Sequence, residues 1–348
     1  MILVGLIGSI EIQRILQTRN GEMYQTSNDN YTMLKKIILL HVIILLLSIA
    51  NGQEVNKERY RLYFLGGQSN MEGHGLNADL PDALVAANDH VWIFHGNPTG
   101  DDNQNGGLGK WDMLKPGNGA GFMSDGVSNK LSHKFGPEVS FGKKLAAQYP
   151  GEKIAVIKYA RGGSSIDSGA ARHFGSWEFD FKASDNQFDY FLKTVIKALG
   201  EKDINGNGIE DELVPCGIVW MQGESDAVLS EEIASRYHDN LKRLMDLCRT
   251  TFRDDDLPVV IGKFSDSGLD NNGKTWRYGE LVQYAQEVYV KNDRNAAIVR
   301  DTKSYDYSDP WHYDSQGYID LGIKFAEAIY LLDKESFKLN QPSTLHHK

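Results

Sequence analysis

The chain has few cysteines and no concentration of positive charge. Only Cys216 and Cys248 occur among its 348 residues, too few for a disulfide framework. In an exported protein the two could pair, or both could be buried free thiols. Lysine and arginine number 37 against 47 aspartates and glutamates, which gives a formal net charge of -10. Because nucleic acid-binding surfaces need a basic stripe, we expect no nucleic acid partner and favour a neutral or small ligand.

The sequence also lacks a hydrophobic run long enough to cross a membrane. Its longest apolar run, 37–47, falls short of the roughly 20 residues that a spanning helix needs. Two lysines precede this run and small or polar residues follow it, the order that marks a secretory signal. We therefore predict a leader at 1–52 and a secreted or periplasmic protein without stable membrane insertion. Met33 would give a conventional short leader, so we interpret it as a candidate true start.

The remainder of the chain has the composition of a large globular domain. It is 41% hydrophobic and shows no obvious repeat, so it can bury a large core. We predict one domain at 53–340, followed by a short tail at 341–348.

Strand-like and helix-like segments alternate along this domain. Apolar strand patterns occur at 61–65, 91–94, 154–159, 214–221, 258–264 and 296–299. Helical periodicity occurs at 137–148, 188–199, 230–249, 277–290 and 315–332. This alternation predicts an α/β fold, a three-layer α/β/α sandwich around a mainly parallel sheet. Ligands bind such sheets beyond the carboxyl ends of the strands.

A serine in a glycine-rich turn follows the first of these strands. The stretch Leu65-Gly-Gly-Gln-Ser-Asn-Met-Glu-Gly73 places Ser69 where the backbone can turn sharply and expose a nucleophile. Near the other end of the chain, Asp309-Pro-Trp-His312 offers an acid and a base three residues apart. Polar glycine clusters at 160–166 and 220–226 each follow another apolar run. A lone serine of this kind is more often a turn residue, so the assignment depends on these partner motifs.

Two other segments call for an interpretation. Residues 95–135 are rich in glycine, asparagine and aspartate, and we predict a long loop that walls the site. The side-chain oxygens of Asp203, Asn205 and Asn207, followed by a glycine, are similar to the first part of a calcium loop, but Val214 stands where that loop has glutamate. The segment is therefore either a solvated turn or a weak calcium site, and we expect no other metal.

The four polar blocks together resemble those of the SGNH hydrolase superfamily. Gly66–Met71 with Trp220–Glu224 is similar to its sialate O-acetylesterase and carbohydrate esterase family six branch, over about residues 60–330. The resemblance implies a flavodoxin-like sandwich and a serine esterase that needs no cofactor. It also implies an acetylated carbohydrate as substrate, either acetylated sialic acid or a plant polysaccharide such as xylan.

The same resemblance assigns catalytic roles. Ser69 matches the nucleophile, His312 the base, and Asp309 the acid that holds the imidazole. In the carbohydrate-esterase branch the glutamate of the third block can orient the histidine instead, so Glu224 is an alternative acid. Both acids stay open at this point.

The resemblance further predicts the groups around the reacting carbonyl. The oxyanion would be held by the backbone N–H groups of Ser69 and Gly163 and by the side-chain amide of Gln222. Many superfamily members have asparagine where this chain has Gln222. Asn70 and His74 lie near the nucleophile in sequence, and we expect them to line the substrate pocket.

Two other functions compete with esterase activity. A catalytically inactive carbohydrate-binding relative would keep the sandwich but not the chemistry, which the intact Ser69 and His312 disfavour. Lipase or thioesterase activity is disfavoured by the polar loop and the lack of a long apolar lid.

Overall fold

A computed structural model describes residues 31–41, 57–86, 88–181 and 185–339. The chain divides into two units, Met1–Asn56 and Lys57–Lys348. In the first unit, residues 31–41 form a helix with exposed side chains. The rest of the predicted leader and all of the predicted tail lie outside the described residues. Among the helices that are described, none has both the length and the apolar character needed to span a membrane.

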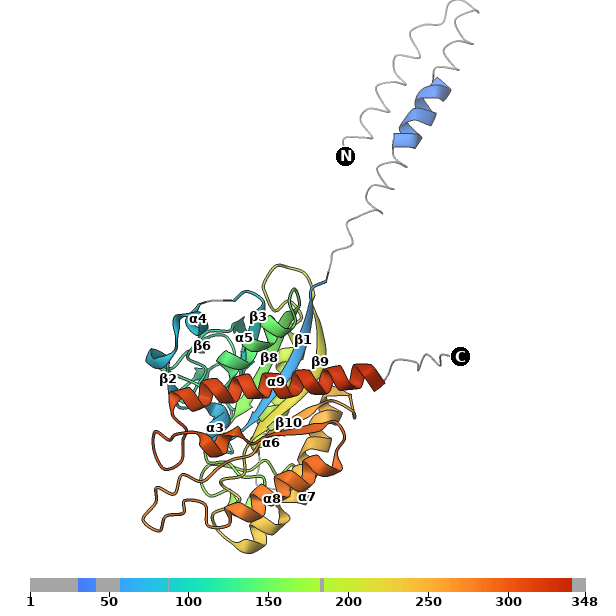
Figure 1. Ribbon diagram of the computed structural model, residues 1–348. Coiled ribbons are helices and arrows are strands. Elements are labelled where there is room, and N and C mark those ends of the chain that lie inside the picture. The colour runs from blue at the N-terminus through green and yellow to red at the C-terminus, as the bar shows by residue number, and fades with distance from the viewer. Residues whose placement is uncertain (1–30, 42–56, 87, 182–184, 340–348) are drawn as a thin grey trace, which may run out of the picture. The chain divides into compact units, whose positions relative to one another are not determined.

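The second unit is built around a seven-stranded sheet (Figure 1). In spatial order its strands are β11 (Ala296–Val299), β10 (Val259–Gly262), β9 (Glu212–Met221), β1 (Arg59–Gly67), β8 (Lys153–Ala160), β3 (Val91–His95) and β4 (Trp111–Met113). Neighbouring strands are parallel, apart from the antiparallel pair of β3 with β4 at one edge. The predicted, mainly parallel sheet is confirmed.

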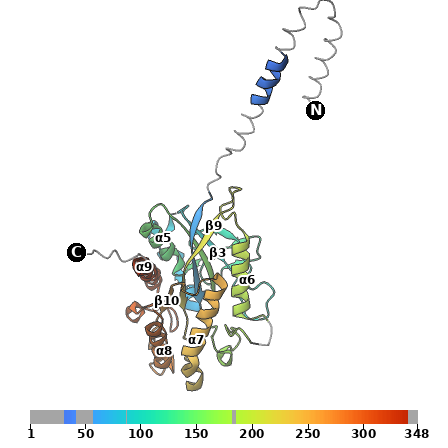
Figure 2. The same ribbon diagram turned by 90° about the vertical axis from the view of Figure 1, so that its right-hand side faces the viewer.

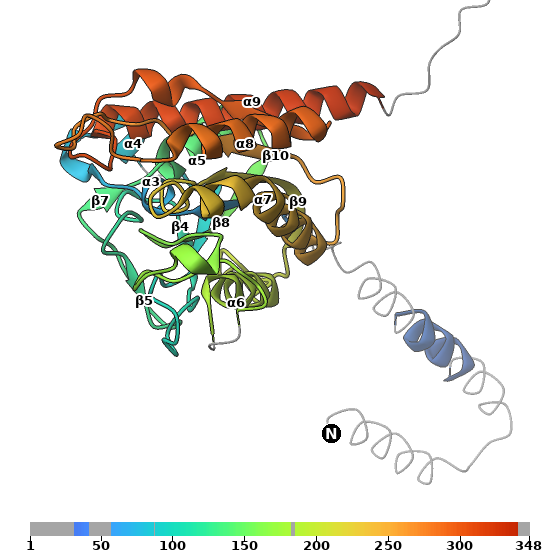
Figure 3. The same ribbon diagram turned by 90° about the horizontal axis from the view of Figure 1, so that it is seen from below.

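Helices cover both faces of the sheet. The long ones are α5 (Glu138–Gln148), α6 (Gln187–Gly200), α7 (Glu231–Phe252), α8 (Gly279–Asn292) and α9 (Ser315–Leu339). Figures 2 and 3 show α5 and α9 packed together on one face and α6 on the other, while α7 packs against α8. Short helices are α3 (Ser69–Glu72) and α4 (Asp82–Val85), with single 3-10 turns at Asn77–Asp79, Ser168–Ala170 and Asp301–Ser304. The predicted α/β/α sandwich is confirmed.

The apolar strands are buried because both sheet faces are covered. Phe64 on β1, Ile157 on β8 and Val219 on β9 are fully buried at the centre of the core. Each buried side chain of this size contributes about 1.5–3 kcal/mol relative to exposure. Capping side chains fix where some helices begin. The Ser230 side chain accepts a hydrogen bond from the Ile233 N–H and caps the N-terminus of α7. This core holds the carboxyl ends of β1, β8 and β9 in fixed positions at one edge.

The segment predicted as one long loop contains several short strands. Besides β4, it forms β5 (Met123–Ser124), which pairs with β6 (Asn129–Lys130), and β7 (Lys134–Phe135). Strand β7 pairs antiparallel with β2 (Gly75–Leu76), which follows α3. Strands β5, β6 and β7 have two residues each and β4 has three, so they are too short for a periodicity that sequence analysis could detect. The β2–β7 ribbon ties the end of the segment to the turn that carries Ser69.

Both cysteines are free thiols. Cys248 is buried in α7, and Cys216 lies on β9, where burial raises the pKa of its thiol to about 11. The alternative of a disulfide between them is therefore wrong, and the two side chains serve as small packing residues.

Candidate active site

Ser69 is held by the turn that ends β1. Gly67 has a φ of +147°, and a Cβ atom there would collide with the carbonyl oxygen of Met221 on β9. The Gln68 N–H donates to that same carbonyl at 2.9 Å. Glycine is required by this close approach. Ser69 follows as the first residue of α3 and is buried except for 7% of its surface, so its position at the strand end is fixed.

Asp309 and His312 form a compact turn before α9. The Asp309 Oδ2 atom lies 2.7 Å from Nδ1 of His312. Its Oδ1 atom accepts the backbone N–H groups of Trp311 and His312 at 2.8 and 2.9 Å. Burial opposes ionisation, but these hydrogen bonds outweigh it and lower the pKa of Asp309 below its usual value. The carboxylate thus accepts the Nδ1 proton and leaves Nε2 as the ring nitrogen free to act as a base.

One cavity brings the two segments together. Its volume is about 470 Å³, which fits a small-molecule site. The lining residues are Gln68, Ser69, Glu72, His74, Ala120, Arg161, Gly162, Gly163, Arg172, Phe174, Ser225, Trp276, Trp311 and His312. Three of the predicted sequence blocks and the Asp309–His312 turn therefore meet at the carboxyl edge of the sheet.

Asn70 lies behind this cavity instead of lining it. Its Nδ2 group donates to Glu224 Oε1 at 2.9 Å and to the Trp311 carbonyl oxygen at 3.1 Å. Its Oδ1 atom accepts the Tyr318 hydroxyl at 2.7 Å and lies 3.4 Å from the Tyr313 N–H. Both ends of the Asn70 amide form hydrogen bonds, and only 1% of the residue's surface is exposed. Asn70 thus links the turn after β1 to the turn before α9, and we call this link the clasp. The structure does not place it for the substrate contact expected from the sequence.

Glu224 is also placed away from His312. Its Oε1 atom accepts the Asn70 bond, and within the described part of the chain Oε2 has no hydrogen-bond partner. Burial raises the pKa of Glu224 to about 7, although the Asn70 bond opposes this. Of the two candidate acids, the structure brings Asp309 to the imidazole, while Glu224 reaches that turn only through Asn70.

The Gln222 amide is committed to bonds beneath the cavity. Its Nε2 group donates to Asp226 Oδ2 at 2.6 Å, to the Ser164 carbonyl oxygen at 3.3 Å and to Gln68 Oε1 at 3.2 Å. Its Oε1 atom accepts the Tyr237 hydroxyl at 2.9 Å. The side chain is fully buried and does not line the cavity. The structure therefore does not bring the predicted side-chain donor to the site.

Gly163 lies in the cavity wall beside Ser69. It has a φ of +77°, and a Cβ there would collide with the Phe174 ring. The neighbouring Gly162 N–H donates to Glu72 Oε2 at 2.7 Å, and a Cβ on Gly162 would lie 3.5 Å from Cβ of Ser69. Among the described residues, no acceptor bonds the backbone N–H groups of Ser69 or Gly163. Two backbone donors therefore remain available near the Ser69 side chain.

Glu72 is a lining residue that the sequence reasoning missed. Burial raises the pKa of its carboxyl group, and the nearby Arg161 and the Gly162 N–H oppose that rise only in part. Glu72 lies three residues after Ser69 on the same short helix, and this spacing could have predicted that the two side chains share a face.

Two arginines in the lining also escaped prediction. Nε of Arg161 is buried and has no hydrogen-bond partner among the described residues. The Arg172 guanidinium lies 5.0 Å from the centroid of the Phe174 ring and 3.3 Å from the Ser225 hydroxyl oxygen. No carboxylate that the structure describes forms an ion pair with either guanidinium. The wall of this site is therefore positively charged, although the chain carries a formal net charge of -10.

His74 lines the cavity as the sequence suggested, and its ring stacks on that of His312 at a centroid distance of 3.7 Å. Trp311 lies beside them with 52% of its surface exposed. The cavity wall beside His312 is therefore aromatic.

In the candidate calcium segment, side-chain oxygens accept hydrogen bonds from backbone N–H groups of the same segment. The Asp203 carboxylate accepts the N–H groups of Asn207 and Gly208, and the Asn207 side chain accepts that of Ile209. No group of three or more His, Cys, Asp or Glu side chains in the described residues is arranged to hold a metal ion. The segment precedes β9, at the opposite end of the sheet from the cavity.

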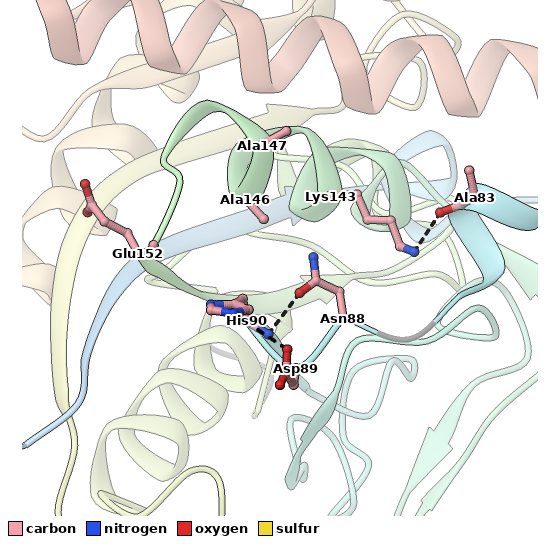
Figure 4. A pocket seen from close by; sticks show the side chains of 9 residues that line it. Ala83, Asn88, Asp89, His90, Lys143, Ala146, Ala147 and Glu152 are labelled. Carbon is pink, nitrogen blue, oxygen red and sulfur yellow. Dashed lines mark hydrogen bonds and ion pairs between the residues drawn. The ribbon is translucent and has the colours of Figure 1, made fainter.

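A second hollow of about 500 Å³ also lies at that opposite end, near the starts of β3 and β8 (Figure 4). It is lined by Ala83, Asn88, Asp89, His90, Lys143, Ala146, Ala147, Gly151 and Glu152. The Lys143 ammonium already donates to the Ala83 carbonyl oxygen at 2.8 Å, and the Asn88 side chain accepts the His90 N–H at 3.0 Å. Of these nine described residues, none is a serine or cysteine, so this hollow offers no side chain of the kind that acts as an acyl-transfer nucleophile.

Comparison with known proteins gives one family. The family model for carbohydrate esterases of the sialic acid-specific acetylesterase type matches residues 59–331. No curated protein matches the chain by sequence.

Solved structures share the fold at low sequence identity. A protein from Arabidopsis thaliana is 20% identical with a TM-score of 0.53, over 78% of this chain and 97% of that one. NanS is 15% identical with a TM-score of 0.51, over 81% and 99% of the two chains. A carbohydrate acetylesterase from Xanthomonas citri is 17% identical with a TM-score of 0.50, over 79% of this chain and 57% of that one.

Proposed function

Because the chain belongs to the carbohydrate esterase family of sialic acid-specific acetylesterases, we propose that it is an exported serine esterase that removes O-acetyl groups from carbohydrates through an acyl-enzyme on Ser69. The family match confirms the resemblance to carbohydrate acetylesterases that was seen in the sequence. It also confirms that the protein is a hydrolase of carboxylic esters. The observation that carries the mechanism is that Ser69 and His312 line one cavity, with Asp309 bonded to Nδ1 of His312.

The reaction proceeds in two halves. His312 Nε2 takes the proton of Ser69 as the Oγ atom attacks the acetyl carbonyl carbon, and Asp309 stabilises the resulting imidazolium. When the tetrahedral intermediate collapses, the imidazolium gives its proton to the departing sugar oxygen, which leaves as an alcohol. A water molecule, deprotonated by His312, then attacks the acetyl-Ser69 ester and releases acetate and free Ser69.

The backbone supplies the oxyanion donors in this scheme. The N–H groups of Ser69 and Gly163 are unengaged within the described structure, and a preorganised donor of this kind contributes roughly 3–4 kcal/mol to the transition state. Gln222, expected from the sequence to be a third donor, instead supports Gln68 and Ser164 from below.

The charge of the cavity wall bears on the choice between acetylated sialic acid and xylan. Among the described residues, no carboxylate forms an ion pair with the guanidinium group of Arg161 or Arg172, and guanidinium binds carboxylate strongly. Sialic acid carries a carboxylate and neutral xylan does not. The proposal therefore favours an acetylated sugar acid as the substrate.

Acetate release by the full chain tests the serine chemistry. Ser69→Ala is expected to lower kcat by several orders of magnitude, leaving a residual rate from the oxyanion donors and binding. The matched control is Ser235→Ala, an exposed serine on α7 that should leave activity unchanged. A Ser69→Ala protein within tenfold of the parent would exclude the acyl-enzyme. If the folded parent binds glycans but releases no acetate, it is the inactive binding relative.

Substrate choice has its own test. With acetylated sialic acid, Arg161→Gln and Arg172→Gln should each raise KM about tenfold or more, because each removes a charge-assisted hydrogen bond. With a neutral acetylated xylo-oligosaccharide the same variants should change KM little. Arg277→Gln, an exposed arginine outside the cavity, serves as the control. Equal effects on both substrates would contradict the preference for a sugar acid.

Export is the remaining part of the proposal. Its support is the order of charged, apolar and small residues within 1–52. N-terminal sequencing of protein from the culture medium or periplasm should give a start near Gln53, and the unprocessed precursor should begin at Met33. An intact Met1 terminus on exported protein would contradict both expectations.

A further inference from the structure

The base of the proposed triad has a stacked neighbour. The ring centroids of His74 and His312 are 3.7 Å apart, and the two planes differ by 9°. One face of the His312 ring is therefore covered, while its edge is held at Nδ1 by Asp309. Together these contacts leave His312 little freedom to tilt or rotate.

A lysine determines the proton position on His74. Nζ of Lys134 lies 3.2 Å from Nδ1 of His74. An ammonium group has only donors, so Nδ1 must be the unprotonated acceptor and Nε2 must carry the proton. Among the described residues no carboxylate forms an ion pair with Lys134, so its charge is directed at the ring. A second proton on His74 would face this cation.

The fold places the lysine for this contact. Lys134 belongs to β7 and pairs with Leu76 on β2, two residues after His74. The β2–β7 ribbon thus positions the Lys134 ammonium group against the edge of the His74 ring, which follows the short helix that begins at Ser69.

We propose that His74 is a positioning residue for the base: kept neutral by its burial and by the neighbouring Lys134, it fixes the plane of the His312 ring and stabilises the imidazolium formed when Ser69 loses its proton. The inference rests on the proposed function, in which His312 is that base. A neutral ring offers an electron-rich face to a cation, whereas a protonated ring would repel it. The role differs from the substrate contact that the sequence suggested for His74.

The charges around the stack agree with a neutral His74. Burial, His312 and Lys134, in that order, lower the pKa of His74 to about 3, and Asp309 opposes them. Glu72 faces His312 from α3, but burial raises the pKa of its carboxyl group. His74 thus stays uncharged over the pH range in which an esterase of this type works.

The first experiment separates positioning from substrate binding. With a chromogenic acetate ester, His74→Ala should lower kcat by about 10- to 100-fold with little change in KM, because a loosened base loses its alignment. His74→Phe restores a flat ring and should recover kcat to within about fivefold of the parent. A rise in KM alone, or equal damage by both variants, would overturn the proposal.

The second experiment tests the role of Lys134 through the pH profile of kcat/KM. The parent should lose activity in acid with a slope of one, because a single proton on the base is enough to stop proton transfer from Ser69. In Lys134→Glu, a carboxylate should attract a proton to His74, so the acid limb should steepen toward a slope of two. Lys134→Gln, which still donates to Nδ1, should keep a slope of one.

A double variant tests whether His74 is the group that binds the second proton. His74→Phe combined with Lys134→Glu should return the slope to one, because phenylalanine cannot bind the second proton. A slope of one in Lys134→Glu itself, or a slope of two in the double variant, would overturn the proposal.

His133→Ala and Lys130→Met, both exposed residues of the same segment, are the controls, and circular dichroism establishes that each variant is folded. If Ser69→Ala stays active, the proposed function fails; if Ser69→Ala is inactive and His74→Ala retains full kcat, this inference alone fails.

Discussion

Replacing each candidate acid in turn gives the sharpest prediction for the triad. In Asp309→Asn, the Oδ1 atom can still accept the N–H groups of Trp311 and His312, as it does in Asp309. The new Nδ2 group then occupies the position of Oδ2, 2.7 Å from Nδ1 of His312. Since this group donates, Nδ1 must accept, and the ring proton moves to Nε2.

The expected magnitude follows from that tautomer. With a proton on Nε2, His312 cannot accept the Ser69 proton, and a triad in this state loses about 10⁴-fold in kcat. Glu224→Gln keeps an Oε1 atom that can accept the Asn70 bond of 2.9 Å, and it touches neither His312 nor the cavity. We expect that variant to lose less than about tenfold in kcat, as a neighbour that does not act on the reacting groups.

The assay is steady-state hydrolysis of a chromogenic acetate ester at neutral pH, with kcat and KM determined separately. Circular dichroism spectra show whether each variant is folded. A severe loss in Glu224→Gln together with near-parental activity in Asp309→Asn would refute the reasoning and make Glu224 the acid.

Three further predictions concern the surroundings of the triad. Gly163→Ala should lower kcat at least about 10²-fold by displacing an oxyanion donor, because its Cβ would collide with Phe174 at a φ of +77°; a rise in KM alone would show that Gly163 only binds substrate. Gln222→Ala should lower the melting temperature as well as kcat, since it leaves the buried Asp226 carboxyl without its 2.6 Å donor; unchanged thermal unfolding would contradict the supporting role. Glu224 has a pKa raised from 4.5 to about 7, so the folded state binds the extra proton and the parent should lose about 3 kcal/mol of unfolding free energy as the pH rises through this interval. Glu224→Gln should show a flatter pH dependence in denaturant titrations, and an identical slope would contradict the raised pKa.

Local signals were sufficient for the long helices, for the central strands and for the contact between Asp309 and His312. Asp309 and His312 are three residues apart, so their bond could be predicted from one turn, and Ser69 was indicated by the glycines that end β1. The alternation of apolar runs and helical periods likewise predicted the layers, because each pattern reflects burial on one or two faces.

Contacts between distant segments could not be predicted in this way. Nothing local indicates that Lys134 lies against His74, or that the Asn70 amide is engaged by Glu224 and so cannot bind substrate. The Gln222 expectation had a local clue that was not used: Asp226, four residues on, is the acceptor that holds its amide beneath the cavity.

The clasp formed by Asn70 has a consequence for biosynthesis. It joins positions separated by 241 to 248 residues in sequence, and contacts of such long range form late in folding. A nascent chain that has reached residue 300 contains Ser69 and all seven strands of the central sheet, but neither His312 nor the helix that carries Tyr318. If His312 is the base, as proposed, a chain truncated before residue 309 is expected to be folded around its sheet but inactive, because it lacks both Asp309 and His312.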